Sequence, residues 1–124
     1  MTREKRTGGC LCGAVRYEIE GPLPAPSACH CAQCRRQHGA LGVYTLAPTD
    51  HYRIKGGRHI VWYESSPGIR RGFCKHCGSK LFWERADSGQ LDVVVGTMDP
   101  PTRLKIEKNI FLADAGDYYD PPSR

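Results

Sequence analysis

The residues most able to do chemistry are seven cysteines, which fall into three short clusters instead of being scattered along the chain. The central cluster, Cys29-His30-Cys31-Ala32-Gln33-Cys34, places three thiols within six residues. Two pairs flank it in the sequence, Cys10-Leu11-Cys12 and Cys74-Lys75-His76-Cys77. Short spacings of this kind bring two sulfurs to one point, and thiolate is a ligand that suits zinc. The pattern therefore predicts metal binding.

The number of cysteines predicts two metal sites of different kinds. Four thiolates close a tetrahedral zinc site, whereas three leave one position for water or a substrate. The simplest division gives a closed site of Cys10, Cys12, Cys74 and Cys77 and an open site of Cys29, Cys31 and Cys34. Spacing alone leaves other divisions open, since either pair could join part of the central cluster. An odd number of cysteines also argues against a fully paired set of disulfides.

An open thiolate site favours the binding of a substrate thiol. A metal lowers the pKa of a bound thiol and holds it as thiolate beside an aldehyde carbonyl, which favours formation of a carbon–sulfur bond. The alternative is a second structural zinc whose fourth ligand is His30, His38 or a residue elsewhere. His30 and His76 lie between ligands, so we expect them to be spacers, with His30 pointing outward. His38 is a weaker candidate for a general base.

Short apolar segments predict the elements that must position these cysteines. The strand candidates are residues 14–20, 41–46, 52–54, 60–63, 69–73, 81–83, 91–95 and 109–113. Residues 55–58 and 87–90 are predicted hairpin turns. Residues 35–39 predict a single helical turn that ends at Gly39, and Cys10 and Cys12 are expected on an extended segment that directs both sulfurs the same way. The sequence thus predicts a mostly β domain with short helical turns.

Composition limits the class of protein. A length of 124 residues suits one domain, and no run of about 18 apolar residues suggests a membrane span. A cytoplasmic protein is expected, because paired cysteines in a reducing cytosol are more often metal ligands than disulfides. The formal charge of +5 falls to about +2 once metal-bound thiolates are counted. Basic residues form no tract, so nucleic acid is not an expected partner, although a non-catalytic zinc module that binds protein or nucleic acid is the competing class.

Most charged and aromatic residues near the clusters are explained by structural roles as well as by roles at a metal site. Arg35 and Arg36 would offset the charge of the open cluster, pair with a substrate carboxylate or form a solvated face. Arg70 and Arg71 alternate on a strand, so at most one faces any site, and surface placement is expected for both. The aromatic residues predicted to lie in the core are Tyr17, Trp62, Phe82 and Trp83.

The three clusters with their neighbours resemble the glutathione-dependent formaldehyde-activating family, which also includes centromere protein V. The resemblance rests on Gly9-Cys10-Leu11-Cys12-Gly13, Cys29-His30-Cys31-Ala32-Gln33-Cys34-Arg35 and Phe73-Cys74-Lys75-His76-Cys77-Gly78-Ser79, in that order. It covers most of the chain, roughly residues 8–119, including an ending that looks like the family's closing segment. The family often has a histidine where this chain has Asn109.

This resemblance implies a single domain over residues 1–124 with a tent-like β fold of the Mss4-like type. It implies a structural zinc at Cys10, Cys12, Cys74 and Cys77 and a second, functional zinc at Cys29, Cys31 and Cys34, which would be the catalytic residues. The implied activity is that of a carbon–sulfur lyase, which reversibly joins glutathione or a similar small thiol to formaldehyde or another small aldehyde. A homodimer is left open.

Overall fold

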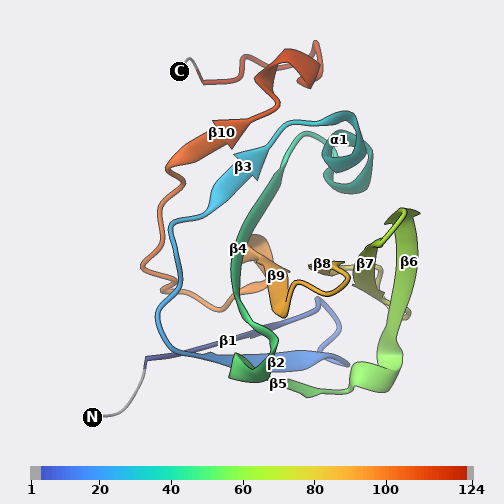
Figure 1. The fold of residues 1–124 in the computed structure, drawn as a ribbon, viewed down its shortest axis with the longest axis vertical. Helices are drawn as coiled ribbons and strands as arrows, with labels where there is room; N and C mark the ends of the chain where they lie inside the picture. The colour runs from blue at the N-terminus through green and yellow to red at the C-terminus, as the bar shows by residue number, and fades with distance from the viewer. Residues whose placement is uncertain (1–3, 123–124) are drawn as a thin grey trace.

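Two β-sheets build the protein, and the computed structural model describes residues 4–122 of the chain (Figure 1). The smaller sheet has the order β1-β2-β5 and consists of β1 (Lys5–Gly9), β2 (Arg16–Glu20) and β5 (Tyr52–Lys55). The larger sheet has the order β10-β3-β4-β9-β8-β7-β6. Its strands are β3 (Ser27–Cys29), β4 (Gly42–Pro48), β6 (Ile60–Ser66), β7 (Ile69–Cys74), β8 (Lys80–Arg85), β9 (Gln90–Val94) and β10 (Lys108–Ile110). β10 runs parallel to β3, and the other neighbouring pairs are antiparallel.

Helical structure is short, as predicted. The α-helix α1 (Ala32–His38) ends at Gly39, whose φ of 99° is the positive value that favours glycine. The helix begins three residues earlier than the predicted turn, inside the central cysteine cluster. Four 3₁₀ turns complete the described chain, at Thr49–His51, Gly57–His59, Val95–Thr97 and Leu112–Asp114. The predicted mostly β fold with short helical turns is confirmed, and no helix among residues 4–122 is long and apolar enough to cross a bilayer.

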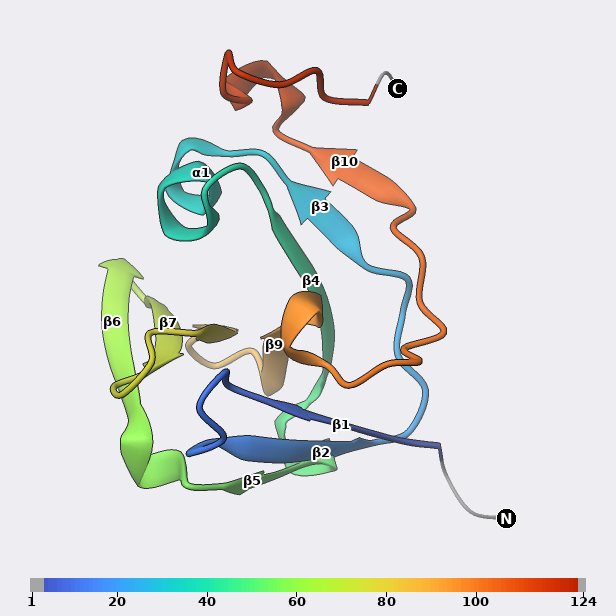
Figure 2. The ribbon, with the colours of Figure 1, turned by 180° about the vertical axis from the view of Figure 1, so that it is seen from behind.

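Alternating apolar residues build the core between the two sheets. In β2, Tyr17 and Ile19 are buried, because side chains of a strand point alternately to opposite faces. They meet the buried residues of the larger sheet, where the Tyr17 ring packs edge-on against Phe82 at 5.6 Å. Seen from behind, the smaller sheet lies across one end of the molecule, and α1 lies with β10 toward the other (Figure 2). The core therefore occupies one face of the larger sheet.

One predicted hairpin is wrong and the other is correct. Residues 52–54 and 60–63 are strands, but β5 pairs with β2 and β6 pairs with β7, so residues 55–58 connect two different sheets. Gly56 has φ 76°, and a Cβ atom there would lie 1.9 Å from the carbonyl oxygen of Ala14, so the loop needs a glycine to pass close to the backbone that precedes β2. The hairpin around residues 87–90 does join β8 to β9.

Candidate metal centres and the cleft between them

The structure brings the cysteines together as four and three. The sulfurs of Cys10, Cys12, Cys74 and Cys77 lie within 4.8 Å of one another, and so do those of Cys29, Cys31 and Cys34. We call these the closed cluster and the open cluster. All seven cysteines are free thiols.

The closed cluster has spacings that suit a tetrahedral ion. The Cys12 sulfur lies 3.6 Å from that of Cys10 and 3.7 Å from that of Cys74. Zn–S bonds of about 2.3 Å place the sulfurs of a tetrahedral site about 3.8 Å apart. The four thiols therefore fit a zinc ion both in donor type and in spacing.

Two tight turns supply these sulfurs. Residues 10–13 form a turn in which the Gly13 N–H donates to the Cys10 carbonyl (3.2 Å), so the expected extended segment at Cys10 and Cys12 is wrong. In the second turn the Gly78 N–H donates to the Cys74 carbonyl (2.8 Å), and Gly78 has a φ of 78°, as its position after the last cysteine predicts. The Leu11 N–H donates to the Ser79 hydroxyl at 2.9 Å, which ties the two turns together.

The thiols of the closed cluster differ in acidity. Hydrogen bonds from the side chain and backbone of Ser79 lower the pKa of Cys77 to about 5. The backbone N–H of Ala14 favours the thiolate of Cys12, but desolvation and the neighbouring sulfurs outweigh it and raise the pKa of Cys12 to about 11. Crowded sulfurs cannot all be thiolates unless a cation lies among them, so the donor set is matched to a divalent metal.

The open cluster is built around the start of α1. Cys29 ends β3, Cys31 is the N-cap of the helix, and Cys34 lies in its first turn. The Cys34 N–H donates to the Cys31 sulfur at 3.3 Å, so a cysteine sulfur performs the capping role that serine or aspartate usually has. Burial raises the pKa of Cys34 to about 12. For Cys31 burial acts in the same direction, but N–H donors from Cys34 and Gln33 and the neighbouring sulfurs outweigh it and lower its pKa.

A cleft of about 560 Å³ lies against the open cluster. All three cysteines of this cluster line it, whereas none of the closed cluster does. Strands of the larger sheet contribute residues two apart, namely Ser27 and Cys29, Tyr44 and Leu46, and Ile69 and Arg71. Residues two apart in a strand share a face, so the cleft lies on the face of the sheet opposite the core.

Arg71 is the buried cation of this cleft, and its expected surface placement is wrong. It is 6% exposed and donates to the hydroxyls of Tyr44 (3.0 Å) and Ser65 (3.3 Å) and to the Gln33 side-chain oxygen (3.3 Å). Its neighbour Arg70 does lie on the other face, where it pairs with Glu84 at 2.6 Å. The predicted alternation is therefore confirmed.

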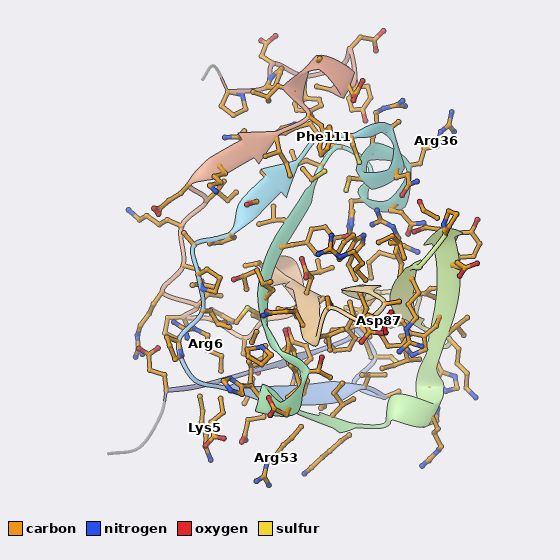
Figure 3. The ribbon with its side chains drawn as sticks, viewed as in Figure 1. Lys5, Arg6, Arg36, Arg53, Asp87 and Phe111 are labelled. Atoms are coloured by element: carbon orange, nitrogen blue, oxygen red, sulfur yellow. The ribbon has the colours of Figure 1, made fainter. Side chains whose placement is uncertain are left out.

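Arg35 and Arg36, which follow the open cluster in sequence, do not line the cleft. Arg36 is exposed and points away from α1 (Figure 3). Arg35 lies against the C-terminal segment, where a Cβ atom at Gly116 would be 3.1 Å from its Cδ. Of the three settings proposed for this pair, a solvated face suits Arg36, and the buried cation of the cleft, Arg71, comes instead from β7.

His30 is fully buried, so the expectation that it points outward is wrong. Its ring does face away from the cleft, but residues 108–119 cover it. Nδ1 lies 2.5 Å from the Tyr119 hydroxyl and Nε2 lies 3.0 Å from the Asn109 side-chain oxygen. These contacts hold the segment that contains Asn109 and Tyr119 against the residues between Cys29 and Cys31. The His76 backbone N–H donates to the Cys74 sulfur (3.4 Å), and its ring lies beside another histidine, with Nε2 3.0 Å from Nδ1 of His59.

His38 is connected to the cleft through a tyrosine. Its Nε2 lies 2.6 Å from the Tyr44 hydroxyl, and burial, with further repulsion from Arg71 and Lys80, lowers the pKa of His38 to about 4. The ring is therefore neutral at pH 7, as a general base must be, but it does not line the cleft itself.

Trp83 and Asp92 also line the cleft, and no motif or spacing indicated either role in advance. Of the four aromatic residues predicted in the core, Tyr17 and Phe82 are buried there and Trp62 packs against them. The prediction for Trp83 is wrong, because its side chain lies on the cleft face of the larger sheet. Alternation along β8 and β9 shows which residues share a face. It identifies the cleft residues only when the face that packs against the core is also known.

Comparison with known proteins gives a consistent result. The sequence profile of the glutathione-dependent formaldehyde-activating enzymes matches residues 5–114. A Halomonas elongata protein named a putative glutathione-dependent formaldehyde-activating enzyme is 34% identical over 84 residues, which cover 60% of this chain and 53% of that protein. An uncharacterized lyase of Schizosaccharomyces pombe is 29% identical over 82 residues, which cover 61% of this chain and 55% of the relative. The chain thus spans about half the length of these curated relatives.

The fold also has a solved counterpart. A crystal structure of a Rhodobacter sphaeroides protein superposes with a TM-score of 0.67 at 25% sequence identity. The match covers 83% of this chain and 97% of that one.

Proposed function

Because this chain belongs to the glutathione-dependent formaldehyde-activating enzyme family, we propose that it is a zinc-dependent carbon–sulfur lyase. The proposed reaction reversibly adds a small thiol, with glutathione as the first candidate, to formaldehyde or another small aldehyde. The sulfur forms the new bond to carbon, the π electrons of the carbonyl move to oxygen, and the proton lost by the thiol ends on that oxygen. Nothing is oxidised or reduced.

The single observation that carries the proposal is the difference in surroundings between the two clusters. The open cluster has three sulfurs and lines the cleft, whereas the closed cluster has four and packs against the core. A three-ligand site that borders a cavity is the arrangement of catalytic zinc, and a four-ligand site is that of structural zinc. We therefore assign one structural zinc to Cys10, Cys12, Cys74 and Cys77 and a second zinc to Cys29, Cys31 and Cys34.

A zinc ion held by the open cluster would lower the pKa of a substrate thiol and keep it as thiolate. The chain supplies the rest. Leu46, Ile69 and Trp83 give the cleft apolar walls, and Gln33 accepts a hydrogen bond from Arg71 beside the cysteines. Because thiols must stay reduced to serve as ligands, the proposal includes a cytoplasmic location.

The Tyr44 hydroxyl is the proposed hydrogen-bond donor to the aldehyde oxygen. It lies on the cleft wall between Arg71, which donates to it, and His38. Burial raises the pKa of Tyr44 above its ordinary value, so the hydroxyl keeps its proton at neutral pH. Negative charge that develops on the aldehyde oxygen would then be stabilised by a fixed donor, which is where hydrogen bonds contribute most to catalysis.

The test is exchange kinetics on the full chain with measured zinc content. Glutathione and formaldehyde combine without a catalyst, so NMR exchange between free and adduct signals reports the acceleration that the protein provides. We expect two zinc ions per chain and an acceleration that is lost when one of them is removed by a chelator and regained when zinc is added back. A protein with two zinc ions that accelerates no combination of small thiol and aldehyde would contradict the proposal and favour a non-catalytic zinc module.

A further inference from the structure

A single row of side chains crosses the cleft face of the larger sheet. Strand pairing places Arg71 of β7 opposite Trp83 of β8, Trp83 opposite Asp92 of β9, and Asp92 opposite Leu46 of β4. All four line the cleft. Side chains directly opposite on neighbouring strands lie about 5 Å apart at Cβ, so the Asp92 carboxylate stands beside the Trp83 side chain, with Arg71 on the far side of that tryptophan.

The Asp92 carboxylate has no partner in direct contact among residues 4–122, and the cation that acts on it at longer range is Arg85. Among residues 4–122 it makes no hydrogen bond, and no cationic group lies within 4.0 Å of it. Partial burial removes water from the Asp92 carboxyl and raises its pKa to about 6. The positive charge of Arg85 lowers this pKa, but by less. A half-buried carboxylate without a partner is costly for a fold to keep, unless something that enters the cleft supplies the missing charge.

The other cations of the cleft are placed elsewhere. Arg71 directs its N–H groups to Ser65, Tyr44 and Gln33, on the side of the open cluster, whose three thiolates around a zinc ion would carry a net charge of −1. Lys108 is exposed at the opposite wall on β10. The cleft therefore has a cation beside its metal end, and on its floor an anion that Arg85 offsets only at longer range.

We propose that Asp92, with Trp83 beside it, is a subsite for an ammonium group of the thiol substrate. The proposal rests on the proposed function, because it assumes that the sulfur end of the same molecule lies at the open cluster. A carboxylate and an aromatic ring together are a common recognition pair for an alkylammonium ion, through a charge-assisted hydrogen bond and a cation–π contact. The subsite selects thiols that carry a free amine, as glutathione does, over otherwise identical neutral ones.

A general-acid role is the rival explanation of the same residue. A protonated Asp92 could deliver the proton that the aldehyde oxygen needs. The two explanations differ in what they predict for a thiol without an amine, because a general acid serves every thiol, whereas an ammonium subsite serves only those that carry the cation.

The experiment compares glutathione with N-acetylglutathione, which keeps the thiol and both carboxylates but has no ammonium group. Binding of each to the zinc-loaded full chain is measured by calorimetry without aldehyde. We expect the wild type to bind glutathione at least about tenfold more tightly, as one hydrogen bond to a charged group predicts. In Asp92→Asn the two ligands should bind equally, through loss of affinity for glutathione alone.

Asp87→Asn is the matched control, because Asp87 is an exposed residue of the turn after β8 and does not line the cleft. It should keep the wild-type preference. If Asp92→Asn does not fold, Asp92→Ser takes its place. Equal affinities in the wild type, or a preference that survives at Asp92→Asn, would overturn the proposal.

Turnover of 2-mercaptoethanol with formaldehyde separates this inference from the proposed function. That thiol has no amine, so an ammonium subsite predicts a much smaller fall in turnover at Asp92→Asn with this thiol than with glutathione. A fall of tenfold or more in the variant would overturn the subsite in favour of the general acid. A wild type that prefers glutathione in binding but accelerates no reaction would retain the subsite and contradict only the lyase.

Discussion

The two faces of the larger sheet border different regions of the molecule, the core on one side and the cleft on the other, although their residues belong to the same strands. In β9, Leu91 and Val93 are buried in the core, whereas Asp92 between them lines the cleft. In β4, Ala47 is in the core and Leu46 lines the cleft. Because neighbouring residues of a strand point to opposite faces, one can stabilise the core while the next lines the cleft.

The same division holds for the cysteines. Cys10 and Cys74 of the closed cluster belong to the core on one face, and the open cluster lies at the end of the cleft on the other. If the faces are independent, changes on the core face should affect folding, and changes on the cleft face should affect substrate binding and turnover.

The largest effect is expected for Cys74→Ala. Metal binding at a structural zinc site contributes about 10 kcal/mol in small domains, which is comparable to the whole stability of a typical domain, about 5–15 kcal/mol. Because Cys74 is fully buried and joins turns 62 residues apart, we expect loss of cooperative thermal unfolding by circular dichroism and loss of bound zinc. A variant that melts within about 5 °C of the wild type would show that this cluster does not hold the fold together.

Cys31→Ser should have the opposite outcome. Serine is a good N-cap, so the variant keeps the start of α1 while it removes one of the three sulfurs of the open cluster. We expect a Tm within a few degrees of the wild type, one zinc ion per chain and at least a hundredfold loss of the acceleration measured by NMR exchange. Unfolding of this variant, or activity near that of the wild type, would contradict the assignment of chemistry to the open cluster.

A matched pair of leucines tests the two faces without touching a cysteine. Leu91 is 3% exposed in the core, and Leu46, opposite Asp92 on β4, is half-buried in the cleft. Leu91→Ala should lower the free energy of unfolding by about 2–4 kcal/mol, with KM unchanged. Leu46→Ala should cost less than about 1.5 kcal/mol and raise KM, since it removes apolar surface from the cleft. Chemical denaturation and steady-state kinetics on both variants measure the contrast, and equal losses of stability would contradict it.

The number of cysteines predicted a division into four and three, but spacing alone left other divisions open, and it is the fold that brings Cys10 and Cys12 beside Cys74 and Cys77. The sequence was sufficient for β2 and for the hairpin between β8 and β9, where alternation and turn residues agree. β1 was missed because its Lys5-Arg6-Thr7 start shows no apolar alternation. Charged residues of this kind are usual on an edge strand, and β1 is an edge of the smaller sheet.

The residues of the cleft were harder to predict, because their position depends on contacts between distant parts of the chain. Arg71 and Asp92 share a face only through the pairing of β7, β8 and β9. His30 is buried only because the segment that contains Asn109 and Tyr119 returns to cover it. A single sequence shows alternation within a strand, but the register between strands and the return of a terminal segment are properties of the assembled sheet.

The smallest effect is expected for the stability of Asp92→Asn, and its sign is unusual for a substitution in a half-buried position. The pKa of Asp92 is raised to about 6 in the folded protein, above its value of about 4 in an unfolded chain. Between these values the folded state binds more protons than the unfolded state, so stability falls as pH rises and the full penalty applies above pH 6. Asparagine has no such charge. At pH 8 the variant should therefore be more stable than the wild type by about 1 kcal/mol, a figure reduced for the partial exposure of the carboxylate, and the gap should narrow at pH 5.

Thermal unfolding of the wild type, Asp92→Asn and Asp87→Asn at both pH values measures this gap. Loss of metal at the lower pH affects all three proteins alike, so only the differences between them are compared. If Asp92→Asn is instead less stable at pH 8, the carboxylate has a structural role and the cleft face is not independent of folding. If it is more stable, the chain keeps at Asp92 a charge that weakens its own fold, which is expected of a residue retained for what it binds.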